Sequence, residues 1–462
     1  MTTERYDAIV IGAGQAGGPL AGALAEAGRR IALIERVHVG GTCINEGCTP
    51  TKTMVASARV AYLACRAADF GVRTGPVSVD LARVRERKRN IVASFRGGTE
   101  RRLAAHPTLD LLLGESRFVD ALTVEVGVNG ATRRLTAEQV FINAGARPGP
   151  AAVPGLAGPR VLDSTSIMEL DALPRHLLVL GGGYIGLEFA QMFRRFGSEV
   201  TVVHRGAHLL SREDDDVADG VAEILEADGI TVALGTTVGQ ATPLGNDGFR
   251  VELTGPRAAC TLDVSHVLVA IGRVPNTNAL ALDAAGIRTD ARGFIAVNDR
   301  LETSAPGVWA LGDVTGGPAF THTSYDDFRI LRNRLLGGDS ARSLSRRLLP
   351  YTVFIDPQLG RVGLTERDAS ARGDDVLVAK MPMSHVARAL EMDESRGFMK
   401  AVVDAKSGRI LGAAVLGIEG GELVSMLQVA MMGDLRWPTL RDAVFAHPLL
   451  AESFNNLFAT LA

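Results

Sequence analysis

A glycine-rich turn between an apolar strand and a helix occurs twice in this chain, and it limits the fold more than any other sequence feature. In the first copy, a β-branched run over residues 8–11 leads into the turn, and a helical stretch follows to Ala27. A second apolar run over residues 30–34 ends at Glu35, where a carboxylate can bind ribose hydroxyls. This pattern predicts a dinucleotide-binding fold with a pyrophosphate at the helix N-terminus. The turn glycines are Gly12, Gly14 and Gly17.

The second copy of the turn follows an apolar strand over residues 177–180 and continues as a helix to Phe196 and a strand over 199–203. That strand leads into His204 and Arg205, where the first copy has an acidic residue. An arginine there suits a ribose 2′-phosphate, which a carboxylate would repel. We therefore expect a second dinucleotide site that prefers NADPH to NADH. Its expected residues are Gly181, Gly183, Gly186, His204, Arg205 and Arg212.

Two of the four cysteines lie just after the first copy, within residues 40–52. Cys43 and Cys48 are close enough in sequence to close a disulfide. Thr49-Pro50 has the pattern of an N-cap followed by a first helical residue, which places Cys48 at the positive end of a helix and lowers its thiol pKa. A pair of buried structural cysteines is the alternative. The other two cysteines have no partner motif and are expected to be buried or incidental: Cys65 and Cys260.

Two dinucleotide sites flanking a redox-capable thiol pair indicate an electron path from NADPH through a flavin to a disulfide. The first copy, which ends in an acid, is then the FAD site. With these motifs the whole chain resembles the class I flavoprotein disulfide reductases, the family of glutathione reductase, dihydrolipoamide dehydrogenase and mercuric reductase. The resemblance implies an α/β fold with two Rossmann-type domains and a C-terminal α+β dimerisation domain.

Two connector-like segments, over residues 142–148 and 270–276, look like the family's crossings between the flavin and nicotinamide domains. They set the expected domain boundaries. We expect an FAD-binding part over 1–148, an NAD(P)-binding domain over 149–269, a second FAD-binding part over 270–341 and a dimerisation domain over 342–462.

The resemblance also implies roles for single residues around the two cofactors. Lys52 and Glu188 match the family's ion pair behind the flavin. Tyr184 matches the aromatic gate that moves aside for the nicotinamide, and Asp313 matches the aspartate that binds the ribityl chain. Further expected contacts are Gly41, Thr42 and Gly145 for FAD and Gly272 for NADPH.

Near the C-terminus, His447 and Glu452 match an acid–base pair that reaches the active site of the partner subunit, which implies a homodimer. In the implied mechanism, NADPH reduces FAD and the electrons pass to the Cys43–Cys48 disulfide, with Cys48 held as a thiolate. Cys43 attacks a small disulfide substrate, His447 protonates the leaving thiol, and Cys48 resolves the mixed disulfide.

Within the family, residues 384–389 and 394–400 resemble the mercuric-reductase-like branch, and residues 320–330 resemble the reactive-chlorine-resistance flavoproteins. The chain ends without a vicinal cysteine pair, so no metal site is assigned and efficient mercury chemistry is not expected. Reduction of Cu or Hg ions or of a quinone is one alternative function. Dihydrolipoamide dehydrogenase is another, and His204 argues against it because that enzyme would carry an acid there.

Charge and hydropathy exclude other classes of partner. The 462 residues carry a formal net charge of -3, so there is no basic field for nucleic acid, and no apolar run reaches membrane-spanning length. The chain passes into its first strand without a signal segment, from which we expect a cytoplasmic enzyme. A redox sensor or binding scaffold is the remaining alternative, which the joint presence of the thiols, Lys52 and the His447–Glu452 pair disfavours.

Overall fold

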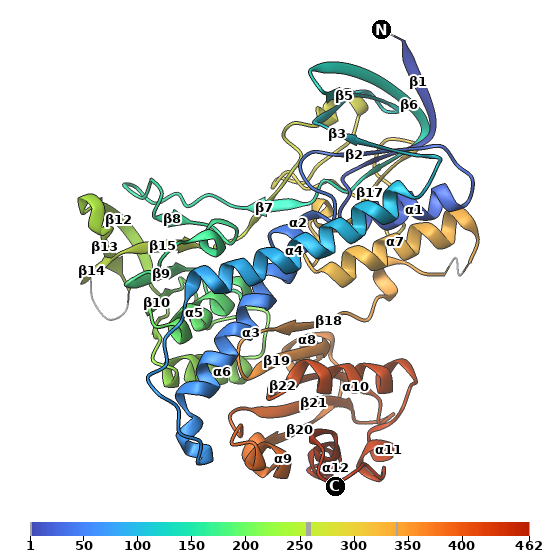
Figure 1. Ribbon diagram of the computed structural model, residues 1–462. Helices are drawn as coiled ribbons and strands as arrows, with labels where there is room; N and C mark the ends of the chain where they lie inside the picture. Colours follow the sequence, from blue (N-terminus) through green and yellow to red (C-terminus); the bar gives the residue numbers. More distant parts are fainter. Residues whose placement is uncertain (1, 256–259, 339–340, 462) are drawn as a thin grey trace. The chain divides into compact units, whose positions relative to one another are not determined.

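The computed structural model describes residues 2–255, 260–338 and 341–461, and the chain forms two compact units (Figure 1). Unit 1 comprises Met1–Met54, Ala82–Gly149 and Gly272–Arg347. Unit 2 comprises Val55–Leu81, Pro150–Ile271 and Leu348–Ala462. The chain therefore leaves unit 1 after Gly149 and returns to it at Gly272, at or beside the two connector-like segments.

Unit 1 is built on one sheet in which the long strand β1 (Thr3–Ile11) is central. It pairs in parallel with β2 (Ile31–Glu35) and β6 (Ala131–Ile142), the arrangement that a βαβ crossover produces. The strand order is β3-β2-β1-β6-β5-β4, with β17 beside β6. The remaining strands are β3 (Leu109–Leu113), β4 (Ser116–Asp120), β5 (Thr123–Val128) and β17 (Val308–Ala310).

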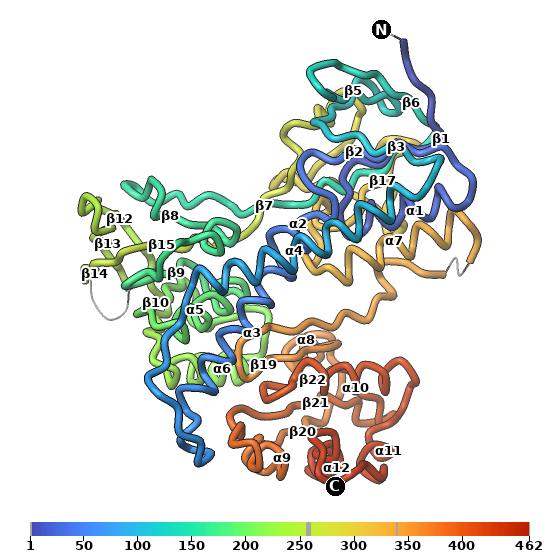
Figure 2. The backbone as a smooth tube through the Cα atoms, in the orientation of Figure 1, coloured from blue at the N-terminus to red at the C-terminus, as the bar shows by residue number. Residues whose placement is uncertain are grey.

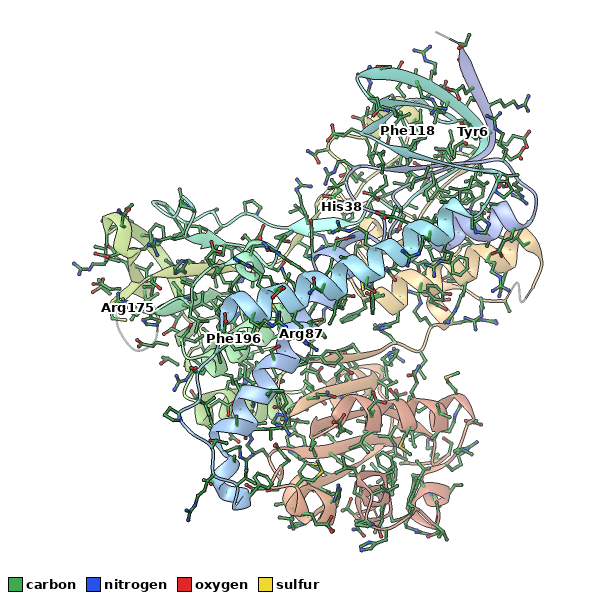
Figure 3. The ribbon with its side chains drawn as sticks, viewed as in Figure 1. Tyr6, His38, Arg87, Phe118, Arg175 and Phe196 are labelled. Atoms are coloured by element: carbon green, nitrogen blue, oxygen red, sulfur yellow. The ribbon has the colours of Figure 1, made fainter. Side chains whose placement is uncertain are left out.

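Both faces of this sheet are covered at its centre, where β2 and the C-terminal ends of β1 and β6 are buried apolar runs. On one face α1 (Gly17–Glu26) and α7 (Thr321–Leu336), blue and gold in Figure 2, lie side by side and share a buried core with the sheet. On the other face Tyr6 and Phe118, labelled in Figure 3, belong to a second core. The connectors pair with each other as β7 (Ala146–Pro148) and β16 (Arg273–Pro275), so the exit and the return of the chain are joined by hydrogen bonds.

Unit 2 contains the second dinucleotide fold. Its sheet has the parallel order β11-β10-β9-β15-β8, and the second glycine turn joins β9 (His176–Leu180) to α5 (Tyr184–Phe196). The strand after the turn helix is β10 (Glu199–Val203), as the sequence pattern predicts. Its other elements are β8 (Val161–Leu162), α6 (Asp215–Ala227), β11 (Thr231–Ala233), β15 (His266–Val269) and a small antiparallel sheet of β12 (Thr237–Pro243), β13 (Phe249–Thr254) and β14 (Cys260–Val264).

The C-terminal part of unit 2 is an antiparallel sheet with the order β18-β19-β22-β21-β20 and helices packed on it. The apolar stretch over residues 423–432 lies within α10 (Gly420–Met432). Its strands are β18 (Pro350–Val353), β19 (Gln358–Gly363), β20 (Val376–Pro382), β21 (Phe398–Asp404) and β22 (Ile410–Gly417), and its other helices are α8 (Glu366–Arg372), α9 (Ala387–Glu391), α11 (Trp437–Arg441) and α12 (Ser453–Ala459).

One expected strand is shorter than the sequence suggests. The apolar run continues from Val353 through Phe354 and Ile355, a pattern that favours a longer strand, but β18 ends at Val353. The backbone N–H of Phe354 donates to the Glu188 carboxylate at 2.8 Å, and that of Asp356 donates to Gln191 at 2.7 Å. These residues pair with side chains of α5 instead of a neighbouring strand. Among the described residues, no helix is both long and apolar enough to cross a membrane.

Candidate active site

The first glycine turn is held closed by a residue that the sequence analysis did not single out, Asn143. A Cβ atom on Gly12 would lie 2.2 Å from the Asn143 carbonyl oxygen, and one on Gly17 would lie 2.0 Å from the Gly12 carbonyl oxygen. The buried Asn143 side chain accepts the Gly17 N–H at 2.9 Å and donates to the Leu311 carbonyl at 2.8 Å. The only signal in the sequence is a polar residue placed directly after the apolar strand that ends at Ile142.

The acid predicted to bind ribose lies at the correct strand end. The Glu35 carboxylate accepts the backbone N–H groups of Ala13 and Val37, each at 2.9 Å. The thiol-bearing segment approaches the same turn so closely that a Cβ on Gly41 would lie 2.7 Å from the Gly14 Cα. Glycines therefore line a turn that side chains cannot enter, with a carboxylate beside it, and this arrangement fits a dinucleotide such as FAD.

Asp313 follows the end of β17, in the short helix Gly312–Thr315. Burial raises the pKa of its carboxyl group, and the nearby positive charge of Arg273 opposes that shift. The preceding residue is fixed because the Gly312 N–H donates to the buried Asp327 at 2.7 Å. Asp313 is thus held at the carboxyl end of a parallel strand, where ligands of such sheets bind.

The two thiols lie at the junction of α2 (Gly41–Asn45) and α3 (Cys48–Cys65). The predicted N-cap at Thr49 is wrong by two residues, because α3 begins at Cys48 and the first helical hydrogen bond runs from the Thr51 N–H to the Gly47 carbonyl at 3.0 Å. Cys48 is therefore the first residue of an 18-residue helix, where the helix dipole favours an anion. Arg96 supports the segment by donating to Asn45 at 2.8 Å.

The structure holds both cysteines as thiols with different surroundings. Cys48 is exposed, and its Sγ lies 3.2 Å from the Thr321 Oγ1 at the start of α7. A hydrogen bond from Cys43 to Cys48 raises the pKa of the Cys43 thiol, with burial and the charge on Cys48 adding to the shift. Thr321 and the charge of Lys52 act in the opposite direction. The neighbouring sulfur thus raises the pKa of Cys43, while Cys48 occupies the helix N-terminus, which favours an anion.

The other predicted thiol and ion-pair residues divide between the two units. Cys65 and Cys260 were expected to be buried or incidental, and both are exposed, so the first of these alternatives is wrong. Lys52 lies one helical turn after Cys48 in unit 1. Glu188 is buried on α5 in unit 2. The pairing of Lys52 with Glu188 stays a prediction.

The second glycine turn repeats the geometry of the first with an imidazole in place of the carboxylate. The Gly182 N–H donates to the Nδ1 atom of His204 at 3.1 Å, as the Ala13 N–H donates to Glu35. Burial, reinforced by the charge of Arg205, lowers the pKa of His204. The ring is therefore neutral, with its hydrogen on Nε2, because Nδ1 serves as the acceptor. Sequence reasoning identified this position only as a missing acid.

The remaining residues expected at NADPH divide between the two units. Arg205 and Arg212 are both exposed, and Tyr184 is half-buried at the start of α5. Gly186 has to be small, because a Cβ there would lie 2.5 Å from the Gly181 carbonyl oxygen. Gly272 lies in unit 1, and its carbonyl accepts the Gly149 N–H at 3.0 Å. The expected contacts of these residues with NADPH stay predictions.

His447 and Glu452, the pair predicted near the C-terminus, are in contact. His447 Nδ1 lies 2.9 Å from Glu452 Oε2, and 69% of the His447 side chain is exposed. An ionised carboxylate can only accept, so Nδ1 carries the hydrogen and Nε2 is the atom that can exchange a proton. Within the described ranges, no group of three or more His, Cys, Asp or Glu side chains could hold a metal ion.

Comparisons with known proteins agree with this geometry. Residues 6–327 match the model of the pyridine nucleotide-disulphide oxidoreductases, and residues 349–458 match the dimerisation domain of the same family. The chain is 39% identical to the probable pyridine nucleotide-disulfide oxidoreductase RclA of Escherichia coli K12, over 99% of each chain. It is 34% identical to a mercuric reductase of Lysinibacillus sphaericus, over 98% of this chain and 82% of that one.

Solved structures lead to the same family. A Cu(II) complex of the HOCl-induced flavoprotein disulfide reductase RclA from Escherichia coli superposes with a TM-score of 0.90 at 39% identity, covering 100% of both chains. A second structure of that reductase superposes with a TM-score of 0.88 over 99% of this chain and 100% of that one. The mixed α/β architecture, with two dinucleotide folds and a C-terminal dimerisation domain, is thereby confirmed.

Proposed function

We propose that this chain, which belongs to the pyridine nucleotide-disulphide oxidoreductase family, uses NADPH and reduces a small disulfide through Cys43 and Cys48. It is a FAD-dependent NAD(P)H:disulfide oxidoreductase. The observation that carries the proposal is the asymmetry of the thiol pair. Cys48 begins α3 beside the Thr321 hydroxyl, and its presence raises the pKa of Cys43. One sulfur is thus prepared as a thiolate and the other as a protonated thiol.

FAD, when bound, converts a two-electron hydride donor into a reductant of a disulfide. The first glycine turn with Glu35 and Gly41 would hold its pyrophosphate and ribose, and Asp313 would hold its ribityl chain. Thr42, Lys52 and Gly145 complete the proposed set. We assign the flavin to residues 1–148 and 270–341, NADPH to 149–269 and the dimer contact to 342–462.

In the proposed reaction the Cys43 thiol gives its proton to His447 of the partner subunit as its sulfur attacks one sulfur of the substrate disulfide, which forms a mixed disulfide and releases the first product thiolate. His447, oriented by Glu452, passes that proton to the leaving thiolate. The Cys48 thiolate then attacks Cys43, which closes the Cys43–Cys48 disulfide and releases the second product as a thiolate that takes up a proton from solvent. Each cycle consumes one NADPH and one proton and gives two thiols. The reducing cytoplasm is the compartment we assign to this chemistry.

Preference for NADPH follows from His204. The neutral imidazole accepts the turn N–H that a carboxylate accepts in the first fold, so the turn is supported without a negative charge beside a 2′-phosphate. Arg205 and Arg212 are exposed on the same segment and can pair with that phosphate.

Steady-state kinetics with both coenzymes test this assignment. In Arg205→Ala and Arg212→Ala we expect the KM for NADPH to rise about 10- to 100-fold, because each loses a charge-assisted contact, and the KM for NADH to stay within about twofold. Arg250→Ala, which removes a solvent-exposed guanidinium of β13, is the matched control and should behave as wild type. Equal KM values for the two coenzymes in the wild-type enzyme would contradict NADPH preference.

Cu(II) is the second candidate acceptor, because a relative of 39% identity has been solved as a Cu(II) complex. Anaerobic NADPH oxidation against small disulfides and Cu(II) distinguishes the two. We expect disulfide turnover that is lost in Cys43→Ser and falls by on the order of 10²- to 10³-fold in His447→Ala, because the leaving thiolate loses its proton donor. Turnover of Cu(II) alone, unaffected by His447→Ala, would assign metal-ion reduction instead.

A further inference from the structure

The segment from His204 to Asp214, which we call the coenzyme loop, carries the residues proposed to select NADPH. Its first half is fixed to the second glycine turn, because Gly182 donates to His204 Nδ1 at 3.1 Å and the Leu210 N–H donates back to the Gly182 carbonyl at 2.9 Å. Leu210 is buried and has a φ of 46°, a left-handed conformation that a branched residue adopts only when its surroundings enforce it. These contacts therefore hold the backbone of the first half of the loop against the glycine turn.

The far end of the loop is fixed by the C-terminal sheet. The Glu213 side chain is buried, with 1% of it exposed, and its carboxylate accepts a hydrogen bond from the Tyr351 hydroxyl. Arg361, 2% exposed, places its Nε 3.7 Å from the same carboxylate. Tyr351 on β18 and Arg361 on β19 are cross-strand partners, so the sheet presents both groups to Glu213 together. Among the described residues, neither the two Nη atoms of Arg361 nor the Oε2 atom of Glu213 has a hydrogen-bond partner, so the two side chains face each other as a buried ion pair.

Asp214 is bound by the same part of the fold. Its carboxylate accepts the backbone N–H groups of Glu366 and Arg367, at 3.1 and 3.0 Å, where α8 begins. The buried Lys400 ammonium lies 3.2 Å from Asp214 and also reaches Glu366 at 2.7 Å. These contacts fix the boundary between the loop and α6.

These anchors have an electrostatic consequence for the coenzyme. Glu213 and Asp214 directly follow Arg212, and two carboxylates there would compete for its guanidinium and repel a phosphate. The Tyr351 hydroxyl and the Arg361 and Lys400 cations bind these two carboxylates in the protein interior. Arg212 stays exposed. Arg212 is close enough to Tyr351 for its charge to act on that phenol.

We propose that Tyr351, Arg361 and Lys400 are positioning residues for coenzyme selection, acting on a bound NADPH through Glu213 and Asp214 without touching it. This inference rests on the proposed role of Arg205 and Arg212. It makes recognition of the 2′-phosphate depend on the C-terminal part of the chain. The effect is specific, because NADH has no group that needs the exposed arginines.

The test compares Tyr351→Phe and Lys400→Met with the wild-type holoenzyme. We expect the KM for NADPH, and the Kd for NADP+ measured by calorimetry without turnover, to rise about 5- to 10-fold in each variant, with kcat and the KM for NADH within about twofold of wild type. Lys406→Met is the matched control, because Lys406 is exposed in the turn after β21 and lies outside the anchors on Glu213 and Asp214. It should leave both KM values unchanged.

Equal changes for NADPH and NADH, or no change in Tyr351→Phe, would overturn the proposal. Tyr351→Phe removes one oxygen atom and keeps the ring, so it decides the question even where Lys400→Met lowers the melting temperature. Arg205→Ala and Arg212→Ala are measured alongside. If they leave the KM for NADPH unchanged, the coenzyme assignment itself is wrong, whereas a rise in those two variants alone refutes only the role of the anchors.

Discussion

At the scale of single residues, the reactivity of Cys43 depends on its neighbour. The hydrogen bond to Cys48 is the largest cause of the raised Cys43 pKa, so less Cys43 thiolate exists at a given pH than for an ordinary thiol. Replacing Cys48 removes that cause, and the pKa of Cys43 should fall towards the usual range. Cys43 then becomes more nucleophilic near neutral pH.

Alkylation of the reduced protein by iodoacetamide, followed by mass spectrometry at each pH, measures this effect. We expect the midpoint for Cys43 to lie above about 8.5 in His447→Ala and to move down by at least one pH unit in His447→Ala with Cys48→Ser. Both proteins lack the histidine, so no imidazole contributes. Cys65→Ser in the same background is the control, and a midpoint shift there of equal size would contradict the account.

His204 gives the second residue-scale prediction. In His204→Glu the carboxylate can still accept the Gly182 N–H, so the turn keeps its support while a negative charge enters the phosphate site. We expect the ratio of kcat/KM for NADPH to that for NADH to fall on the order of 100-fold, because like charges become neighbours. His204→Gln, which adds no charge, should change the ratio far less. An unchanged ratio in His204→Glu would show that residue 204 does not contribute to the discrimination between NADPH and NADH.

At the scale of elements, Asn143 joins the first glycine turn to the strand end at Leu311. In Asn143→Ala the buried Gly17 N–H and Leu311 carbonyl lose their partners. We expect a loss of roughly 2 kcal/mol or more in the free energy of unfolding and weaker FAD retention, measured by denaturation and flavin absorbance. Gln139→Ala, which removes a peripheral contact with Arg29, should leave both unchanged. Full stability of Asn143→Ala would contradict this account.

Elements that depend on local pattern could be predicted from sequence, and those that depend on distant partners could not. The glycine turns, β2 and β10 follow from short runs of residues whose chemistry is self-contained. The early end of β18 could not be foreseen, because it depends on Glu188 of α5 receiving the Phe354 N–H. The support of the second turn by His204 was hidden for a similar reason, since a sequence shows that an acid is missing and not what replaces it.

At the scale of the whole molecule, the dimerisation domain supports a homodimer, and α10 carries a row of exposed apolar side chains. They are Met426, Val429 and Met432. We expect Val429→Asp to weaken the dimer at least ~10-fold, because two-fold symmetry places each substitution at the interface twice. Analytical ultracentrifugation measures this, and Leu377→Asp, on an exposed position of β20, is the control. An intact Val429→Asp dimer would place the interface elsewhere.

The central claim is that each active site takes its thiols from one subunit and its acid–base pair from the other. Mixing the inactive homodimers Cys43→Ser and His447→Ala under conditions of subunit exchange tests it most directly. Half of the resulting dimers are mixed, and each mixed dimer holds one intact site, so disulfide turnover should recover to about a quarter of the wild-type value. Recovery to that level would establish the shared site. Turnover no higher than the mean of the two parents, with exchange verified by native mass spectrometry, would contradict it.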